Sequence, residues 1–180
     1  VTLLMVLARK DPHKFYEDML DETDRLAQRV TASGSTEGML ELWLEILALH
    51  REIEARGAET AELHLFLAPV LREACLCALR KEDYATARTL YAEYFGILGG
   101  LTVAEPDELA DFVISTLHDM SALLARPDQQ AERLALYQQG LGGLETLAAR
   151  MPQTCTLPLV AHIERLGLLL VECGQADAAL

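Results

Sequence analysis

The sequence predicts an all-α protein, and three observations lead to this fold class. Apolar residues make up 51% of the 180 residues and aromatic residues only 6%. Leu and Ala dominate, and both are strong helix formers without a branched Cβ. Capping residues, prolines and glycines also recur at the spacing expected of helix ends, and no segment has the pattern of a strand.

The first half of the chain is expected to form four helical segments. Residues 1–10 are an apolar helical stretch, and Asp11-Pro12 places a capping side chain before a proline at the first position of a helix over 11–31. A helix over 36–56 and another over 60–80 follow, the latter kinked or split by Pro69. The inward faces are predicted to carry Phe15, Met19, Leu26 and Val30 in the first long helix and Met39, Trp43, Ile46, His50 and Ile53 in the second.

The second half is expected to form four more helices. One runs over 83–98 and ends at Gly99-Gly100, one starts at 105–107, and one starts at Pro127-Asp128. The last full helix is predicted to begin at Pro158 and to stop at Gly174. Three glycines at 140, 142 and 143 lie inside a helical pattern, which indicates a kink or a close helix contact. Short connections between these helices make neighbours antiparallel.

The charge of the chain limits its partners. The formal charge is −13, from 28 acidic and 15 basic residues. Nucleic acid or an anionic membrane is disfavoured because phosphate binding needs clustered Lys and Arg. A basic or neutral partner is more compatible, although acidity can also serve only to keep a Leu-rich chain soluble.

The four cysteines, Cys75, Cys77, Cys155 and Cys173, are expected to be buried structural thiols. Cys75 and Cys77 are two residues apart in a helical stretch, so their side chains point about 200° apart and cannot share one metal as a CxxC turn can. Such cysteines suit a reducing compartment. No apolar run reaches the roughly 18 residues of a membrane span and no signal peptide is recognisable, so we expect a cytoplasmic protein.

No motif names a reaction. His118-Asp119 with Cys75 and Cys77 would be a conceivable metal site, but no HExxH or CxxC supports it. The acidic run from Glu17 to Asp24 lacks calcium-loop spacing and is expected to be a solvated face. No serine has a GxSxG context, and the glycine pairs lack the Gly-Lys-Ser/Thr ending of a phosphate loop. We therefore expect no enzyme activity, no metal and no cofactor.

The stretch "IERLGLLLVECGQADAAL", 163–180, carries a family resemblance. Ile163, Leu166 and Leu170 lie on one helical face, Gly167 is the small residue of a Leu-Gly pair, and Gly174 turns the chain toward Ala179. This resembles the first helix and the start of the second in a tetratricopeptide repeat, whose two helices touch at small residues.

A second copy of this pattern is "LREACLCALRKEDYATARTLYAEYF", 71–95. Leu71, Ala74 and Ala78 match the first-helix face, Cys75 replaces the small glycine, and Ala87 continues the second helix. A third, loose match runs through Asp128, Ala131 and Ala135. Ala87, Ala131 and Ala179 are 44 and 48 residues apart, whereas the family repeats every 34 or so, so the hairpins are lengthened.

The resemblance implies a concave groove lined by first-helix residues that holds an extended peptide or a partner helix. Carried onto the two copies, it gives these partner-binding candidates: Arg72, Leu76, Arg80, Glu164, Leu168 and Glu172. Their chemistry is mixed and lacks the paired Lys, Asn and Arg of clamps for peptide carboxylates.

We therefore expect a single helical-repeat domain over 1–180, a piece of a longer chain, whose antiparallel hairpins stack as a tetratricopeptide-like right-handed superhelix. The expected function is a protein-interaction or sensor module of a regulator or scaffold protein. Two other classes stay open: a cytoplasmic helical chaperone that binds the leader peptide of a cofactor enzyme, and a helical-bundle enzyme with a metal or small-molecule pocket. An uncovered face at Leu168, Val171 and Ala179 would also favour self-association.

Overall fold

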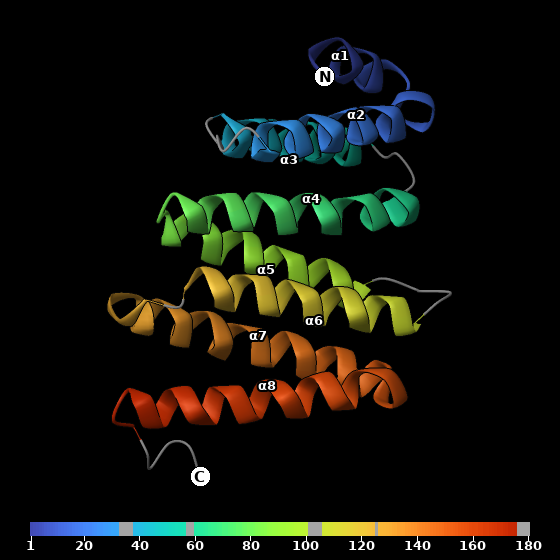
Figure 1. Cartoon of the computed structure of the whole chain (residues 1–180). Helices are drawn as coiled ribbons and strands as arrows, with labels where there is room; N and C mark the ends of the chain where they lie inside the picture. The colour runs from blue at the N-terminus through green and yellow to red at the C-terminus, as the bar shows by residue number, and fades with distance from the viewer. Residues whose placement is uncertain (33–37, 57–59, 101–105, 125, 176–180) are drawn as a thin grey trace. The chain divides into compact units, whose positions relative to one another are not determined.

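The computed structural model describes residues 1–32, 38–56, 60–100, 106–124 and 126–175, and every element in them is helical (Figure 1). This confirms the all-α prediction. The elements are α1 (Thr2–Lys10), α2 (Pro12–Ala32), α3 (Met39–Ala55), α4 (Thr60–Arg80), α5 (Tyr84–Gly100), α6 (Pro106–Leu123), the 3₁₀ helix η1 (Pro127–Gln129), α7 (Gln130–Arg150) and α8 (Pro152–Glu172).

Most helix boundaries follow from local chemistry. Prolines stand at the first position of α2, α6 and α8, where the missing N–H is not needed. The Asp83 carboxylate accepts a hydrogen bond from the Thr86 N–H at 3.1 Å and so caps α5. Hydrogen bonds from the side chain and the backbone of Thr86 lower the pKa of Asp83. α5 ends at the predicted glycine pair.

Two helices contain internal prolines. The prediction that α8 begins at Pro158 is wrong, because this helix begins at Pro152. For Pro69 the sequence left a kink or a split after Leu67 open, and the split is excluded because α4 is continuous through this residue. An internal proline removes one helical hydrogen bond, and a helix can tolerate this loss when the neighbouring turns are held by packing. Pro158 and Cys155 are both buried, so tertiary contacts hold α8 together across the proline.

The contacts divide into two compact units, residues 1–77 and 78–180, and the single domain over 1–180 stays a prediction. In the first unit α1 packs against α2 and α3. The predicted stripe of α3 is confirmed, since all five of its residues are buried. On α2 the buried face is displaced toward Tyr16, Met19 and Thr23, while Phe15 is only half-buried and Leu26 is exposed; the side chain of Val30 lies outside the described set.

The displacement on α2 has a polar cause. The Tyr16 hydroxyl and His50 Nδ1 share a buried hydrogen bond of 2.9 Å, and the Thr23 hydroxyl donates to the Met19 carbonyl at 2.7 Å. Hydroxyl groups that find such partners can be buried without penalty. A search for purely apolar stripes does not count them as inward residues.

In the second unit α7 packs against α5 and α8, and α6 packs against α8 (Figure 1). The core is rich in aromatic rings: Phe95 contacts Tyr91 and Tyr94 edge to face, with centroids 4.9 Å and 5.3 Å apart. A Cβ atom on Gly143 would lie 2.2 Å from the Phe95 ring, so α5 and α7 approach too closely for any side chain there. Of the two predicted alternatives, a kink or a close helix contact, the close contact is confirmed at Gly143 and Gly140 but not at Gly142, where a Cβ atom would meet nothing within 4 Å.

Two helix ends have the same turn. After α4, Glu82 has φ of 60° and the Asp83 N–H donates to the Ala78 carbonyl at 2.9 Å. After α8, Gly174 has φ of 72° and the Gln175 N–H donates to the Leu170 carbonyl at 2.8 Å. Both are left-handed caps with a bond spanning five residues. The two turns occupy corresponding positions in the two sequence copies, with Glu82 in the place of the turn glycine.

Candidate binding groove

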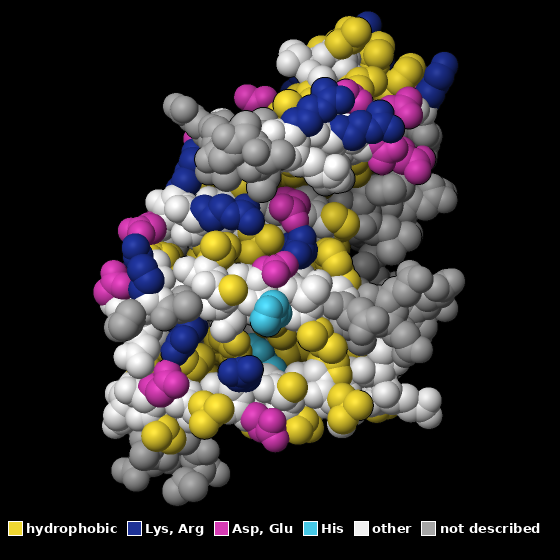
Figure 2. Space-filling view, in the orientation of Figure 1, with side chains coloured by type: hydrophobic (Ala, Val, Ile, Leu, Met, Phe, Trp, Pro, Cys, Tyr) yellow, Lys and Arg dark blue, Asp and Glu magenta, His cyan; other side chains and the backbone are white. Residues whose placement is uncertain are grey.

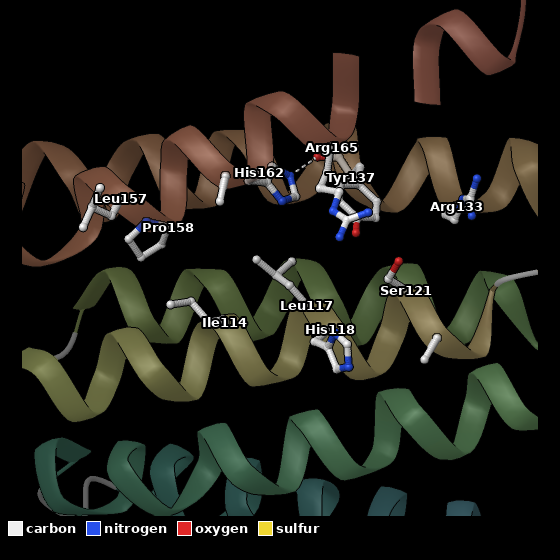
Figure 3. Close-up of a pocket in the computed structure, with 12 residues that line it drawn as sticks. Ile114, Leu117, His118, Ser121, Arg133, Tyr137, Leu157, Pro158, His162 and Arg165 are labelled. Carbon is white, nitrogen blue, oxygen red and sulfur yellow. Dashed lines mark hydrogen bonds between the residues drawn. The ribbon is translucent and has the colours of Figure 1, made fainter. Parts of the chain in front are cut away.

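A groove of about 600 Å³ lies between α6, α7 and α8, entirely within the second unit. In Figure 2, histidine and apolar side chains border a hollow on the face that is shown. The described residues that line the groove are Ile114, Leu117, His118, Ser121 and Ala122 of α6, Arg133 and Tyr137 of α7, and Leu157, Pro158, Ala161, His162 and Arg165 of α8 (Figure 3).

The groove is apolar at one end and polar at the other. Ile114, Leu157 and Pro158 lie together at one end of the close-up, and Ser121 lies with Arg133 toward the other (Figure 3). The eight-residue interval from Ile114 to Ala122 along α6 corresponds to about 12 Å at 1.5 Å per residue. The groove therefore suits an elongated ligand with one apolar and one polar end.

Two arginines supply positive charge to the groove. Arg165 is exposed on α8 and makes no hydrogen bond or ion pair with any described residue. Arg133 donates from Nη2 to Glu172 at 2.7 Å, and its Nε is buried without a hydrogen-bond partner among the described residues. Arg165 thus offers an unneutralised cation, while the charge of Arg133 is partly balanced.

His162 forms part of the groove wall and is only 3% exposed. Its ring stacks on Tyr137 with centroids 4.8 Å apart, and Nε2–H donates to the Tyr137 carbonyl at 2.6 Å. Because a carbonyl can only accept, the proton of the neutral ring is on Nε2. Burial lowers the pKa of His162, partly offset by this hydrogen bond. Nδ1 is then an acceptor, buried and without a partner in the described part of the chain.

Gly140 leaves the space that His162 occupies. A Cβ atom at this position would lie 2.6 Å from the Tyr91 hydroxyl oxygen and 3.2 Å from His162 Nε2. Because Gly140 has no side chain, α7 can approach both rings, and the His162 imidazole can reach the Tyr137 carbonyl on the same helix. The groove wall depends on this glycine as much as on the histidine.

The six residues predicted to bind a partner do not line this groove. Arg72 is half-buried and pairs with Glu73, Leu76 is buried, and Arg80 is exposed. Glu164, Leu168 and Glu172 are exposed on α8, with Leu168 59% exposed. Of the six, Glu172 is directly related to the groove, because it pairs with Arg133.

The residues that sequence reasoning missed are His162, Arg133 and Arg165, whose roles depend on three helices meeting. His118, which the sequence suggests only as a conceivable metal ligand, lines the groove as well. In the described part of the chain, no three His, Cys, Asp or Glu residues are grouped to hold a metal ion. An isolated arginine on a polar helix face carries no signal in the sequence that would have singled it out.

Three of the four cysteines, Cys75, Cys77 and Cys155, are buried as expected, whereas Cys173 is half-exposed.

The helix α8 is long and apolar enough to cross a membrane by length and composition. Its mean hydropathy is 1.4, and 33% of that segment is buried. One such helix is weak evidence of a span, because core helices of soluble proteins meet the same criteria.

No protein-family model, no curated protein sequence and no solved structure matches this chain.

Proposed function

We propose that this chain is a non-catalytic binding module whose groove between α6, α7 and α8 receives a short segment of a partner protein. The observation that carries the proposal is the groove itself: about 600 Å³, apolar at one end, with hydrogen-bond donors at the other. Pockets of this size with a few polar groups on apolar walls are typical ligand sites. An extended segment spanning about 12 Å corresponds to about four residues.

We also propose that the helices form a tetratricopeptide-like right-handed superhelix. Two observations support this arrangement. In the second unit α5 packs against α7 and α6 against α8, the alternate-helix contacts that stacked hairpins make. The turns at Glu82 and Gly174 are also equivalent and lie 92 residues apart. Small-angle scattering tests the arrangement, since a curved, elongated particle would agree with it and a compact sphere would refute it.

The outward face of α8 is proposed as a surface for self-association. Ile163, Leu168 and Val171 are 48%, 59% and 56% exposed. Their counterparts in the earlier copy, Leu71, Leu76 and Leu79, are all buried. A face that is covered in one copy and open in the other favours association with another apolar surface. Ala179, predicted to share this face, lies outside the described residues.

The alternative of a chaperone for a cofactor enzyme has no observation of its own in its favour. A leader peptide rich in arginine would meet Arg133 and Arg165 in the groove, and like charges oppose binding. A titration with such a leader peptide tests this alternative directly. Binding in the groove would refute the charge argument.

The binding function is tested by selecting short peptides from a displayed library and measuring their affinity for two variants. Ala161→Trp fills the groove from an exposed position on α8. Gln153→Trp, exposed on the same helix but outside the groove, is the matched control. Selected peptides should lose binding to the first variant and keep it with the second. Equal binding to both variants would place the site elsewhere.

A further inference from the structure

The charge of the groove is opposite to that of the chain. The sequence carries a net charge of −13, but the described residues that line the groove include two arginines, two histidines and no Asp or Glu. Glu172 is not one of the lining residues, but its carboxylate forms an ion pair with the lining residue Arg133. Local charge, rather than net charge, determines which ligand a pocket accepts.

From this distribution we propose that the groove binds a monoanionic carboxylate attached to an apolar chain, with the carboxylate at Arg165 and the chain toward Ile114 and Leu157. The proposal rests on the proposed binding function and specifies its ligand chemistry. Two sources share this chemistry: an acidic residue in an apolar peptide segment, and a free aliphatic acid.

The arginines set the charge of the ligand. Arg165 has no ion pair with any described residue, and Arg133 already has Glu172 as its partner at 2.7 Å. One full positive charge is therefore available, which a carboxylate balances and a phosphate dianion would exceed. The planar guanidinium of Arg165 can donate two parallel hydrogen bonds to a carboxylate.

The apolar end sets the rest of the ligand. Leu157 is 79% exposed and Ile114 is 46% exposed, and both border the groove with Pro158. An apolar chain lying over them would remove this surface from water, at about 0.8 kcal/mol per buried methylene group. The carboxylate then fixes which way the ligand lies.

His162 supplies a second sign that the groove is built for a ligand. It is buried, its Nε2–H is used by the Tyr137 carbonyl, and its Nδ1 has no partner in the described part of the chain. Buried polar atoms without partners are rare in proteins. Because Nδ1 of the neutral ring is an acceptor, a backbone N–H of a peptide segment would supply the donor that it lacks, while the carboxylate pairs with Arg165.

The experiment uses the full chain and two matched pairs of probes. The first pair is octanoate and octanol, and the second is the blocked peptide acetyl-Leu-Ala-Leu-Asp-amide and its Asn counterpart. Titrations are followed by the methyl signals of Ile114, Leu117 and Leu157 in NMR spectra. They are repeated with Arg165→Gln and, as a control, with Arg29→Gln, an exposed arginine on α2 outside the groove lining.

The acidic member of at least one pair should bind about tenfold more tightly than its neutral counterpart, as expected for a charge-assisted contact. Arg165→Gln should remove this difference, and Arg29→Gln should retain it. The pair that binds more tightly identifies the source as peptide or free acid. Equal binding of acidic and neutral probes would overturn the carboxylate proposal and leave the groove function standing. If none of the four probes shifts the methyl signals, both proposals fail.

Discussion

Replacing Gly143 by Ala tests the packing of α5 against α7. The added Cβ would lie 2.2 Å from Cγ and Cδ1 of Phe95 and 2.7 Å from its Cβ. Rotating the ring cannot relieve a contact with the Phe95 Cβ, and the ring itself is held by Tyr91 and Tyr94. The two helices must therefore move apart.

The magnitude follows from two opposing effects. Ala is about 1 kcal/mol better than Gly inside a helix. Overpacking a core typically costs about 1–3 kcal/mol, and a contact this short belongs at the upper end. We expect Gly143→Ala to lower the free energy of unfolding by about 2 kcal/mol.

Gly142→Ala is the matched control, because a Cβ at the adjacent position meets nothing within 4 Å. It should gain up to about 1 kcal/mol from helix propensity alone. Urea unfolding followed by far-UV circular dichroism measures both variants against the parent chain. If Gly143→Ala proved as stable as Gly142→Ala, the close approach of α5 and α7 described above would be wrong.

Three further predictions concern polar groups. Tyr16→Phe should lower the free energy of unfolding by about 1–2 kcal/mol, since the Tyr16 hydroxyl is hydrogen-bonded to the buried His50. Tyr94→Phe should lower it less, because Thr116, the partner of the Tyr94 hydroxyl, keeps its hydrogen bond to the Phe112 carbonyl. Equal losses for the two variants in urea unfolding would contradict this reasoning. Burial lowers the pKa of His162 below its ordinary 6.5, so its contribution to stability is present above pH 6.5 and falls as the pH drops toward the folded-state pKa. Urea midpoints between pH 7.5 and 5 should then fall less steeply for His162→Gln, and an unchanged slope would argue against a buried neutral ring. Among the cysteines, Cys173 should react first with a maleimide, because it is half-exposed, whereas Cys75 is buried and burial raises its pKa to about 12. Mass spectrometry of the labelled folded chain locates the adduct. Labelling of Cys75 before Cys173 would contradict the burial of Cys75.

Much of the fold could be predicted because helix signals are local. The cap at Asp83, the proline that begins α2 and the glycines that end α5 act within one turn of their own positions. The helix α8 was misplaced for the same reason. Pro158 is a helix breaker by local rules, and packing of its neighbours inside α8 overrides them.

The candidate groove could not be predicted because no local pattern contains it. Arg133 on α7 and His162 and Arg165 on α8 look like ordinary helix residues, and the −13 charge of the chain indicated a basic or neutral partner. The predicted binding residues were carried over from a family pattern, and their role stays a prediction.

The sequence by itself determined the all-α class and the positions of most helices, since these depend on residues near one another in the chain. Only the tertiary structure decided that α6, α7 and α8 join His118, Arg133, His162 and Arg165 around one groove. The physical reason is that a pocket's charge is the sum over residues that folding brings together, whereas composition averages over the whole chain.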